Sequence, residues 1–244
     1  MRLRMTVAYD GTQFSGWQSQ AHGKAVQDAL ESAFRRLCGG RIVVHGSGRT
    51  DAGVHAEGQS AHADVPDDRL PIVSWLPALN AHLPHGVRVM NLKKARPDFH
   101  ARFSARGKIY RYMIWNGPVL PPLLINRAWH VPGPLDPGLL RSACECFTGR
   151  HDFAAFCARR TRAAEPTTRT VTSIRPARKG FGLTLTFEGD GFLYKMVRML
   201  AASAVRCAAG RLTLDGIRRL LKEAGPRTSQ VAPAGGLCLV RVLY

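Results

Sequence analysis

The sequence has no long apolar segment and no closely spaced pair of cysteines. No stretch approaches the roughly 20 apolar residues that a membrane-spanning helix requires, and the opening MRLRMTVAYDGT lacks the apolar block of a secretory signal. The six cysteines contain no C-x-x-C pair, so neither a zinc ribbon nor a disulfide framework is indicated. We therefore expect a cytoplasmic chain with reduced cysteines and no membrane partner.

Motifs that bind nucleotide phosphates or activate a serine are also missing. Neither G-x-x-x-x-G-K-S/T nor G-x-G-x-x-G occurs, and Ser47 lacks the G-x-S-x-G spacing of a hydrolase nucleophile. These absences argue against nucleotide hydrolysis and acyl transfer.

Acidic residues are scarce relative to basic ones. The chain has 17 Asp and Glu against 35 Lys and Arg, a net charge of +18. Residues 1–104 hold 13 basic and 9 acidic residues, a net of +4, whereas residues 105–244 hold 22 and 8, a net of +14. Because such a surplus attracts polyanions, we expect nucleic acid as the partner, held mainly by the second half.

The segment GSGRTDAGVHA, Gly46–Ala56, is predicted to be a tight loop that presents an acid. Its three glycines tolerate a positive φ or the close approach of another segment, and Thr50 and Asp51 commonly bond to nearby amides in turns. Asp51 either caps this turn or serves as a reactive carboxylate. Arg49, two residues before Asp51, either keeps that carboxylate ionised or binds a phosphate and leaves the acid available.

Apolar periodicity indicates strands and helices in an order that occurs twice. The first half is expected to contain strands at 3–9, 41–45, 60–65 and 86–92 and helices at 26–37 and 74–83. The second half is expected to contain strands at 109–115, 170–174, 182–187 and 237–243 and helices at 139–147, 192–207 and 213–221. We therefore predict an α+β protein of two ferredoxin-like β-α-β-β-α-β halves, with adjacent, mainly antiparallel sheets and a basic cleft between them.

The two halves are expected to be separate domains. Residues 1–104 form the N-terminal half that carries the Asp51 loop, and residues 105–244 form the strongly basic C-terminal half. Within the second half, residues 157–169 have four arginines and no apolar periodicity. They are either a mobile basic loop that closes on the partner or a solvated connector.

Six motifs follow one another along the chain. They are YDGTQFSGWQ (9–18), GRTDAGVHA (48–56), FHARFSARGKIYRY (99–112), GRHDFAAFC (149–157), GDGFLYKMVRML (189–200) and APAGGLCLVRVLY (232–244). This set resembles the tRNA pseudouridine synthase A family from the first strand to the last residue. The resemblance implies an enzyme that isomerises uridine to pseudouridine at positions 38, 39 and 40 of the tRNA anticodon stem-loop. It also implies a homodimer that uses no metal or organic cofactor.

The resemblance further implies roles for three residues. The family's catalytic aspartate falls on Asp51, its active-site tyrosine on Tyr110 and its basic partner on Arg198. Judged from the strand pattern alone, Tyr110 either stacks on the uracil, places its hydroxyl near the reacting carbon, or belongs to the core. Leu237 and Leu239 likewise either form a wall of the uracil site or are core residues of the last strand.

The basic side chains near the expected site have more than one interpretation. Arg198 falls in a helical pattern with Lys195 and Arg206, which predicts a basic stripe. Arg198 either belongs to that solvated stripe or turns toward Asp51 and keeps it charged. Arg49 is expected to hold a backbone phosphate of the reacting nucleotide.

The isomerisation needs one carboxylate in a water-poor pocket, as a nucleophile at the sugar or as a base that removes a proton from it. The sequence leaves both routes open. A base paired in a stem must first be flipped out, at a cost of a few kcal/mol that phosphate contacts offset.

Two other functions remain open on the residues alone. A cluster of loop and strand residues offers donors for a divalent metal and nuclease chemistry, although its spacing matches no metal signature: His45, Asp51, His55, His62 and Asp64. Alternatively, the chain is an RNA-binding module whose GRTD loop grips phosphate without chemistry. Sensitivity to chelator, the length of the RNA and its pseudouridine content separate the three functions.

Overall fold

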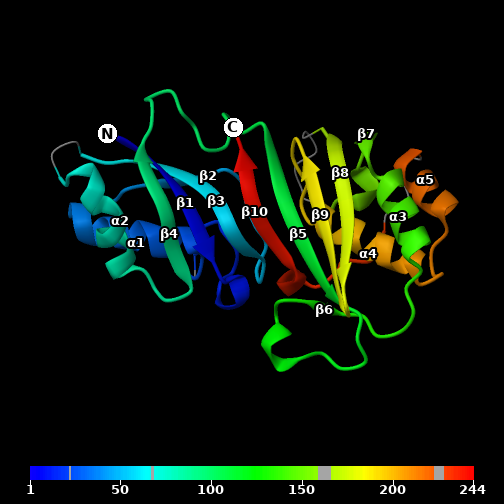
Figure 1. Cartoon of the computed structure of the whole chain (residues 1–244). Helices are drawn as coiled ribbons and strands as arrows, with labels where there is room; N and C mark the ends of the chain where they lie inside the picture. The colour runs from blue at the N-terminus through cyan, green and yellow to red at the C-terminus, as the bar shows by residue number, and fades with distance from the viewer. Residues whose placement is uncertain (22, 67–68, 159–165, 223–227) are drawn as a thin grey trace. The chain divides into compact units, whose positions relative to one another are not determined.

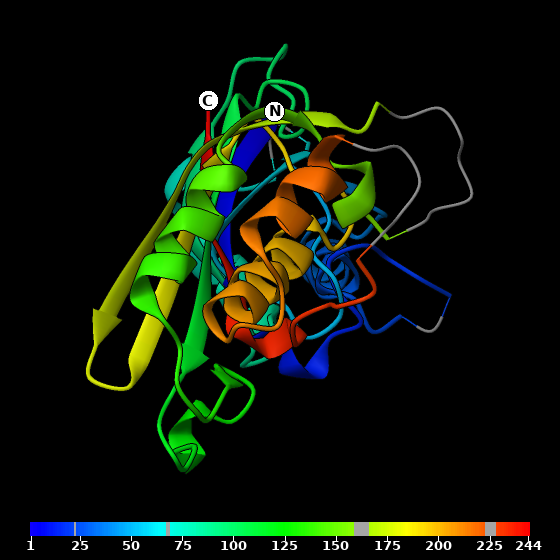
Figure 2. The same ribbon diagram turned by 90° about the vertical axis from the view of Figure 1, so that its right-hand side faces the viewer.

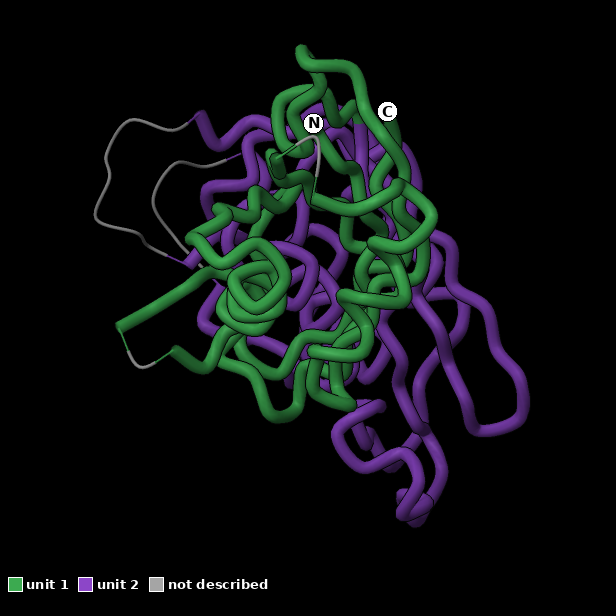
Figure 3. Tube along the Cα trace, turned by 90° about the vertical axis from the view of Figure 1, so that its left-hand side faces the viewer, with its two compact units in different colours: residues 1–106, 238–244 green, residues 107–237 purple. Residues whose placement is uncertain are grey.

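A computed structural model describes residues 1–21, 23–66, 69–158, 166–222 and 228–244. The chain forms two compact units, coloured separately in Figure 3. Unit 1 contains Met1–Arg106 together with Cys238–Tyr244, and unit 2 contains Gly107–Leu237. Among the described residues, no helix is long and apolar enough to cross a membrane.

In its described residues, unit 1 contains a set of paired strands with two helices packed on them (Figure 1). Its elements are β1 (Arg2–Tyr9), α1 (Val26–Cys38), β2 (Val44–Gly46), β3 (His55–Asp64), α2 (Ile72–His82) and β4 (Val87–Lys94), joined by β10 (Leu237–Leu243). The strands lie in the order β4-β1-β3, all antiparallel. On the far side of β3, β2 pairs antiparallel with its later residues, and β10 pairs parallel with its first residues.

The side-chain pattern of β1 shows which face of this strand meets the core. Leu3, Met5, Val7 and Tyr9 are buried, whereas the residues between them are only half-buried, so one face of β1 meets the core and the other faces outward. In that core the rings of Phe34 from α1 and Trp75 from α2 lie 5.9 Å apart.

The strands of unit 2 pair mainly antiparallel, and in the described residues three helices lie on one side of them (Figure 2). Its elements are β5 (Gly107–Trp115), β6 (Trp129–His130), α3 (Pro137–Cys146), β7 (Gly149–Asp152), β8 (Thr168–Lys179), β9 (Gly182–Gly189), α4 (Met196–Ala208) and α5 (Leu214–Lys222). The strands lie in the order β5-β9-β8-β7, and β6 pairs parallel with β5. Asp136 caps α3 by accepting a hydrogen bond from the amide of Leu139, as its position before Pro137 predicts.

The predicted α+β class is confirmed, and unit 1 has the predicted β-α-β-β-α-β order. Several predicted boundaries were wrong. The helix predicted over 192–207 begins only at Met196, because Lys195 takes a left-handed backbone conformation with φ of 62°. The strand predicted at 60–65 starts five residues earlier, at His55, and the short strands β6 and β7 were missed.

Candidate active site

The Asp51 loop joins β2 to β3 and is fastened first by β3 itself. Gln59, which is fully buried, accepts a hydrogen bond from the Ser47 hydroxyl (2.7 Å) and donates one to the carbonyl of Gly48 (2.9 Å). The amide of Val54 bonds to the carbonyl of Asp51 (3.2 Å), which closes the turn at the tip of the loop. Both ends of the loop are therefore fixed by hydrogen bonds within unit 1.

A second set of contacts comes from residues 9–18, the first of the six motifs. The Tyr9 hydroxyl and the Thr50 hydroxyl are hydrogen-bonded at 2.8 Å in a buried position. The amide of Trp17 donates to the carbonyl of Thr50 (3.1 Å), and the amide of Gly53 donates to the carbonyl of Phe14 (3.4 Å). Burial raises the pKa of Tyr9 above its ordinary value, while the hydrogen bond to Thr50 acts in the opposite direction.

Glycine allows the two segments to touch at backbone distance. A Cβ on Gly16 would lie 2.5 Å from the carbonyl oxygen of Thr50, and one on Gly11 would lie 2.1 Å from that of Val54. Gly16 also has a φ of 93°, which an L side chain rarely adopts. Residues 9–18 therefore act as a clamp on the Asp51 loop. Sequence reasoning missed this role, although the two glycines of YDGTQFSGWQ carry the signal.

On this clamped loop, Asp51 is half-buried and Arg49 is exposed. The Arg49 guanidinium donates to the side-chain oxygen of Gln18 at 3.3 Å, a long hydrogen bond to the end of the clamp. A carboxylate that is partly accessible, on a backbone held from two sides, has the fixed position that a reactive group needs.

Three of the five donors proposed for a metal are engaged in hydrogen bonds. Nδ1 of His62 accepts from the amide of Ala101 (3.2 Å), and Nδ1 of His55 accepts from the amide of Gly11 (3.1 Å). Asp64 binds Arg2 through both oxygens, and this hydrogen-bonded pair lowers the pKa of the Asp64 carboxyl. Across the described ranges, no three His, Cys, Asp or Glu side chains come together as metal ligands. This arrangement does not support a nuclease metal centre.

Tyr110 and its neighbour Tyr112 lie on the buried face of β5 in unit 2. Tyr110 is 7% exposed, and its ring meets that of Phe192 edge-on at 5.4 Å. Tyr112 is fully buried and donates its hydroxyl to the carbonyl of Pro233 at 2.7 Å. Tyr112 is thus a core residue, whereas Tyr110 keeps a small accessible part.

Arg198 is tied to the segment that precedes β10. Its Nε donates to the carbonyl of Ala232 (2.7 Å), and the amide of Ala232 donates back to the carbonyl of Arg198 (3.3 Å). The predicted basic stripe was wrong in part, because Lys195 precedes α4 instead of lying on it. Arg206 bonds to the carbonyl of Arg211 at 3.3 Å.

The remaining predicted site residues are largely buried. Leu237 is 6% exposed and Leu239 is 1% exposed, as the core interpretation of both expects. Leu239 pairs with Ala56 of β3, immediately after the Asp51 loop. Unit 1 therefore holds Asp51, Arg49 and Leu239, and unit 2 holds Tyr110, Arg198 and Leu237. Most of the basic loop predicted at 157–169 lies outside the described residues.

A fixed carboxylate in a strongly basic α+β chain is the arrangement expected of an enzyme that acts on nucleic acid. Residues 5–104 and 143–244 match the family described as tRNA pseudouridine synthase. The chain belongs to this family, as its motifs predicted, and is an isomerase that converts uridine to pseudouridine in tRNA.

Curated relatives align with this chain over nearly its whole length. A protein of Akkermansia muciniphila named tRNA pseudouridine synthase A is 46% identical, covering 100% of this chain and 95% of its own. Proteins of the same name from Solidesulfovibrio magneticus and Pelobacter propionicus are 43% and 40% identical, over 100% and 99% of this chain and 91% and 99% of theirs. A chain of a solved Cbf5-Nop10-Gar1 complex aligns over 98% of this chain and 49% of its own length, at 13% identity and a TM-score of 0.39.

Proposed function

We propose that the chain modifies uridines 38, 39 and 40 in the anticodon stem-loop of tRNA, and that Asp51 is the residue that reacts. The observation that supports Asp51 is the clamp: Tyr9, Gly16 and Trp17 fix the backbone on which this half-buried carboxylate stands. A turn that only connects two strands needs no such second support.

The reaction requires bond exchange at one sugar carbon without any other reactant. The bond between C1′ and N1 breaks, the uracil rotates, and C5 forms a new bond to C1′ while its proton is lost and N1 gains one. As a nucleophile, Asp51 adds to C1′ when the uracil leaves with the bonding electrons, and departs when C5 attacks. As a base, it takes a proton from the sugar and later returns it. Both routes need an ionised carboxylate held at a set distance from the ribose.

We propose that the other site residues bind and orient the nucleotide. Arg49, exposed beside Asp51, binds a backbone phosphate and helps offset the few kcal/mol of base flipping. Tyr110 stacks on the extruded uracil, and Arg198 favours the charged form of the catalytic acid. Leu237 and Leu239 supply apolar surface to the uracil site.

The resemblance also supports proposals about the state in which the enzyme works. We propose a homodimer, located in the cytoplasm, that acts without metal or organic cofactor and without a membrane partner. A chelator should then leave its activity unchanged.

The test uses tRNA incubated with the protein in EDTA and then digested to nucleosides. Wild type should form pseudouridine and leave the RNA at full length, whereas Asp51→Asn should bind tRNA with nearly unchanged affinity and form none. Asp215→Asn is the matched control, since this side chain is 86% exposed on α5 and should behave as wild type. A tRNA with cytidine at positions 38, 39 and 40 should yield no product.

Each alternative has its own outcome in this assay. Shortened RNA that EDTA prevents would indicate a nuclease, and binding without product would indicate a non-catalytic module. Product from the cytidine-substituted tRNA would refute the target positions while leaving the activity in place.

A further inference from the structure

Unit 1 carries a basic groove in addition to the Asp51 loop. Its volume is about 520 Å³, and nine residues line it, none of them acidic: Arg4, Lys93, Lys94, Ala95, Arg96, Phe99, Ser104, Arg106 and Tyr244. We call it the Arg4 groove.

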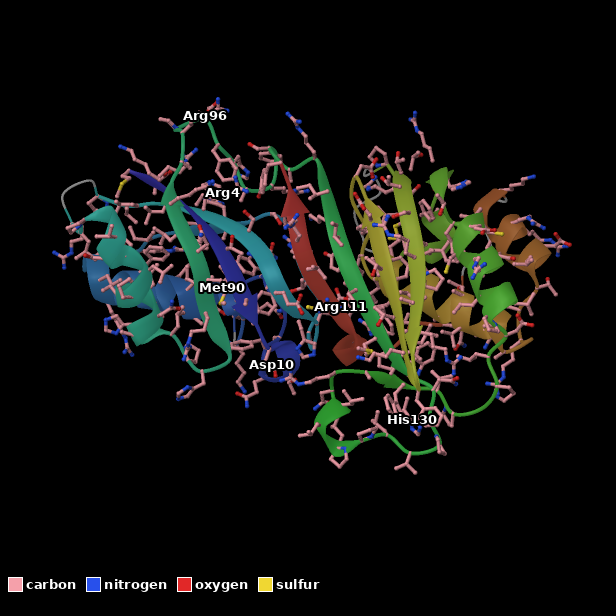
Figure 4. The ribbon with its side chains drawn as sticks, viewed as in Figure 1. Arg4, Asp10, Met90, Arg96, Arg111 and His130 are labelled. Carbon is pink, nitrogen blue, oxygen red and sulfur yellow. The ribbon has the colours of Figure 1, made fainter. Side chains whose placement is uncertain are left out.

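The Arg4 groove is separate from the Asp51 loop. Tyr9 reaches Thr50 of that loop from the covered face of β1, whereas Arg4, an odd number of residues away, belongs to the opposite face. At about 3.3 Å per strand residue, Arg4 and Tyr9 are also roughly 17 Å apart along β1. Figure 4 shows Arg4 and Arg96 at one end of the unit 1 sheet and Asp10, which follows Tyr9, at the other.

Aromatic rings hold the Arg4 side chain in place. Its guanidinium lies 4.0 Å from the centre of the Tyr244 ring and 4.9 Å from that of Phe99, and these two rings are 5.2 Å apart. The Tyr244 hydroxyl donates to the carbonyl of Ala101 at 2.8 Å, which fixes its ring. A guanidinium stacked in this way loses little entropy when its N–H groups bind a phosphate.

The positive charges in the Arg4 groove repel one another when no anion is bound. Arg4 and Lys93 are direct cross-strand partners on β1 and β4, an arrangement of like charges that destabilises a sheet. Arg96 pairs with Asp98 at 3.3 Å, but both side chains are mostly exposed, so the pair is weak. In the described part of the chain, Lys93, Lys94 and Arg106 make no ion pair. A polyanion bound here would relieve the repulsion.

We propose that the Arg4 groove binds the phosphate backbone of tRNA outside the anticodon stem-loop, and so adds affinity without taking part in the chemistry. The inference rests on the proposed stem-loop target of Asp51. Guanidinium and ammonium groups around stacked aromatic rings suit a phosphodiester chain, which they bind by charge and bidentate hydrogen bonds.

The experiment compares two triple variants with equal loss of charge. The groove variant carries Lys93→Gln, Lys94→Gln and Arg106→Gln, all exposed positions that should fold normally. The control variant carries Arg36→Gln, Lys179→Gln and Lys222→Gln, which are exposed on other elements. Dissociation constants are measured at several salt concentrations for full-length tRNA and for the isolated anticodon stem-loop.

The groove variant should bind full-length tRNA at least tenfold more weakly than the control variant. The slope of log K against log salt should fall by about 0.9 for each duplex phosphate that is no longer neutralised, so by up to about 3. Its KM for tRNA should rise with kcat unchanged, and both variants should bind the stem-loop like wild type.

Three results would overturn the proposal. Equal weakening in both variants would mean that only general charge matters, and a matching weakening on the stem-loop would place the groove in the catalytic site. A change of oligomeric mass in the groove variant alone would make a second copy of the chain the occupant. If wild type does not modify the stem-loop, the proposed target fails separately, because tRNA affinity is measured without turnover.

Discussion

His62 should make the stability of this enzyme fall as the pH drops from 6.5 toward 4. The ring is 2% exposed, and it stacks on His45 at 4.9 Å and meets His100 at 4.6 Å. Burial, helped by these two histidines and by Arg2 and opposed by Asp64, lowers the pKa of His62 from 6.5 to about 4. Between these two values the unfolded chain binds the proton more readily than the folded one. The contribution of neutral His62 to the free energy of unfolding is therefore complete above pH 6.5 and is lost progressively as the pH falls toward 4.

The size of the effect follows from the pKa shift. A shift of this size corresponds to about 3 kcal/mol in total, of which about 2 kcal/mol should be lost between pH 7 and pH 5. His62→Asn keeps an acceptor near the amide of Ala101 but cannot be protonated. The free energy of unfolding, measured in urea by tryptophan fluorescence, should therefore depend less steeply on pH in this variant, by about 2 kcal/mol over that interval.

His82→Asn serves as the control, because His82 is exposed at the end of α2 and should leave the pH dependence as in wild type. If the free energy of unfolding depends on pH equally in wild type and His62→Asn, the reasoning is refuted, because the buried ring would then bind a proton as readily in the folded chain as in the unfolded one.

Three further predictions concern the active site. Gly16→Ala should lose turnover, and its free energy of unfolding should fall by more than the roughly 1–2 kcal/mol that left-handed strain alone costs. Gly23 has a φ of 66° and open space around it, so Gly23→Ala is the control and should show only that strain in a thermal melt. Tyr110→Phe should retain single-turnover activity if the ring only stacks on uracil, and its loss would assign a role to the hydroxyl. Arg198→Ala should depress kcat more than Lys195→Ala does, and equal losses would mean that this region supplies general charge only.

The sequence was most informative where a local pattern decides the structure. The alternation of Leu3, Met5, Val7 and Tyr9 predicts β1, and Asp136 before Pro137 marks the start of α3. The family followed from motifs that can be recognised along the linear sequence, and the comparisons confirmed it.

The features that sequence reasoning missed depend on contacts between distant residues or on single backbone angles. The bond between Tyr9 and Thr50 joins residues 41 positions apart, and no periodicity in the sequence signals it. Phe192 and Leu193 fit a helical spacing, but the left-handed Lys195 delays α4. The Arg4 groove likewise draws on residues from the start, middle and end of the chain. Composition placed most of the surplus charge in residues 105–244, so it did not locate this surface, whose basic residues come mainly from residues 1–104.

The pairing of β10 with β3 has a consequence for how the enzyme is made. Cys238 and Leu239 lie beside His55 and Ala56, the first residues after the Asp51 loop, yet the ribosome produces them only after all of unit 2. During translation, the residues of β3 that pair with β10 therefore stay without this partner strand until residues 238–244 have been synthesised. A premature stop that removes only residues 238–244 would thus damage the region around the reactive aspartate, far upstream in the message.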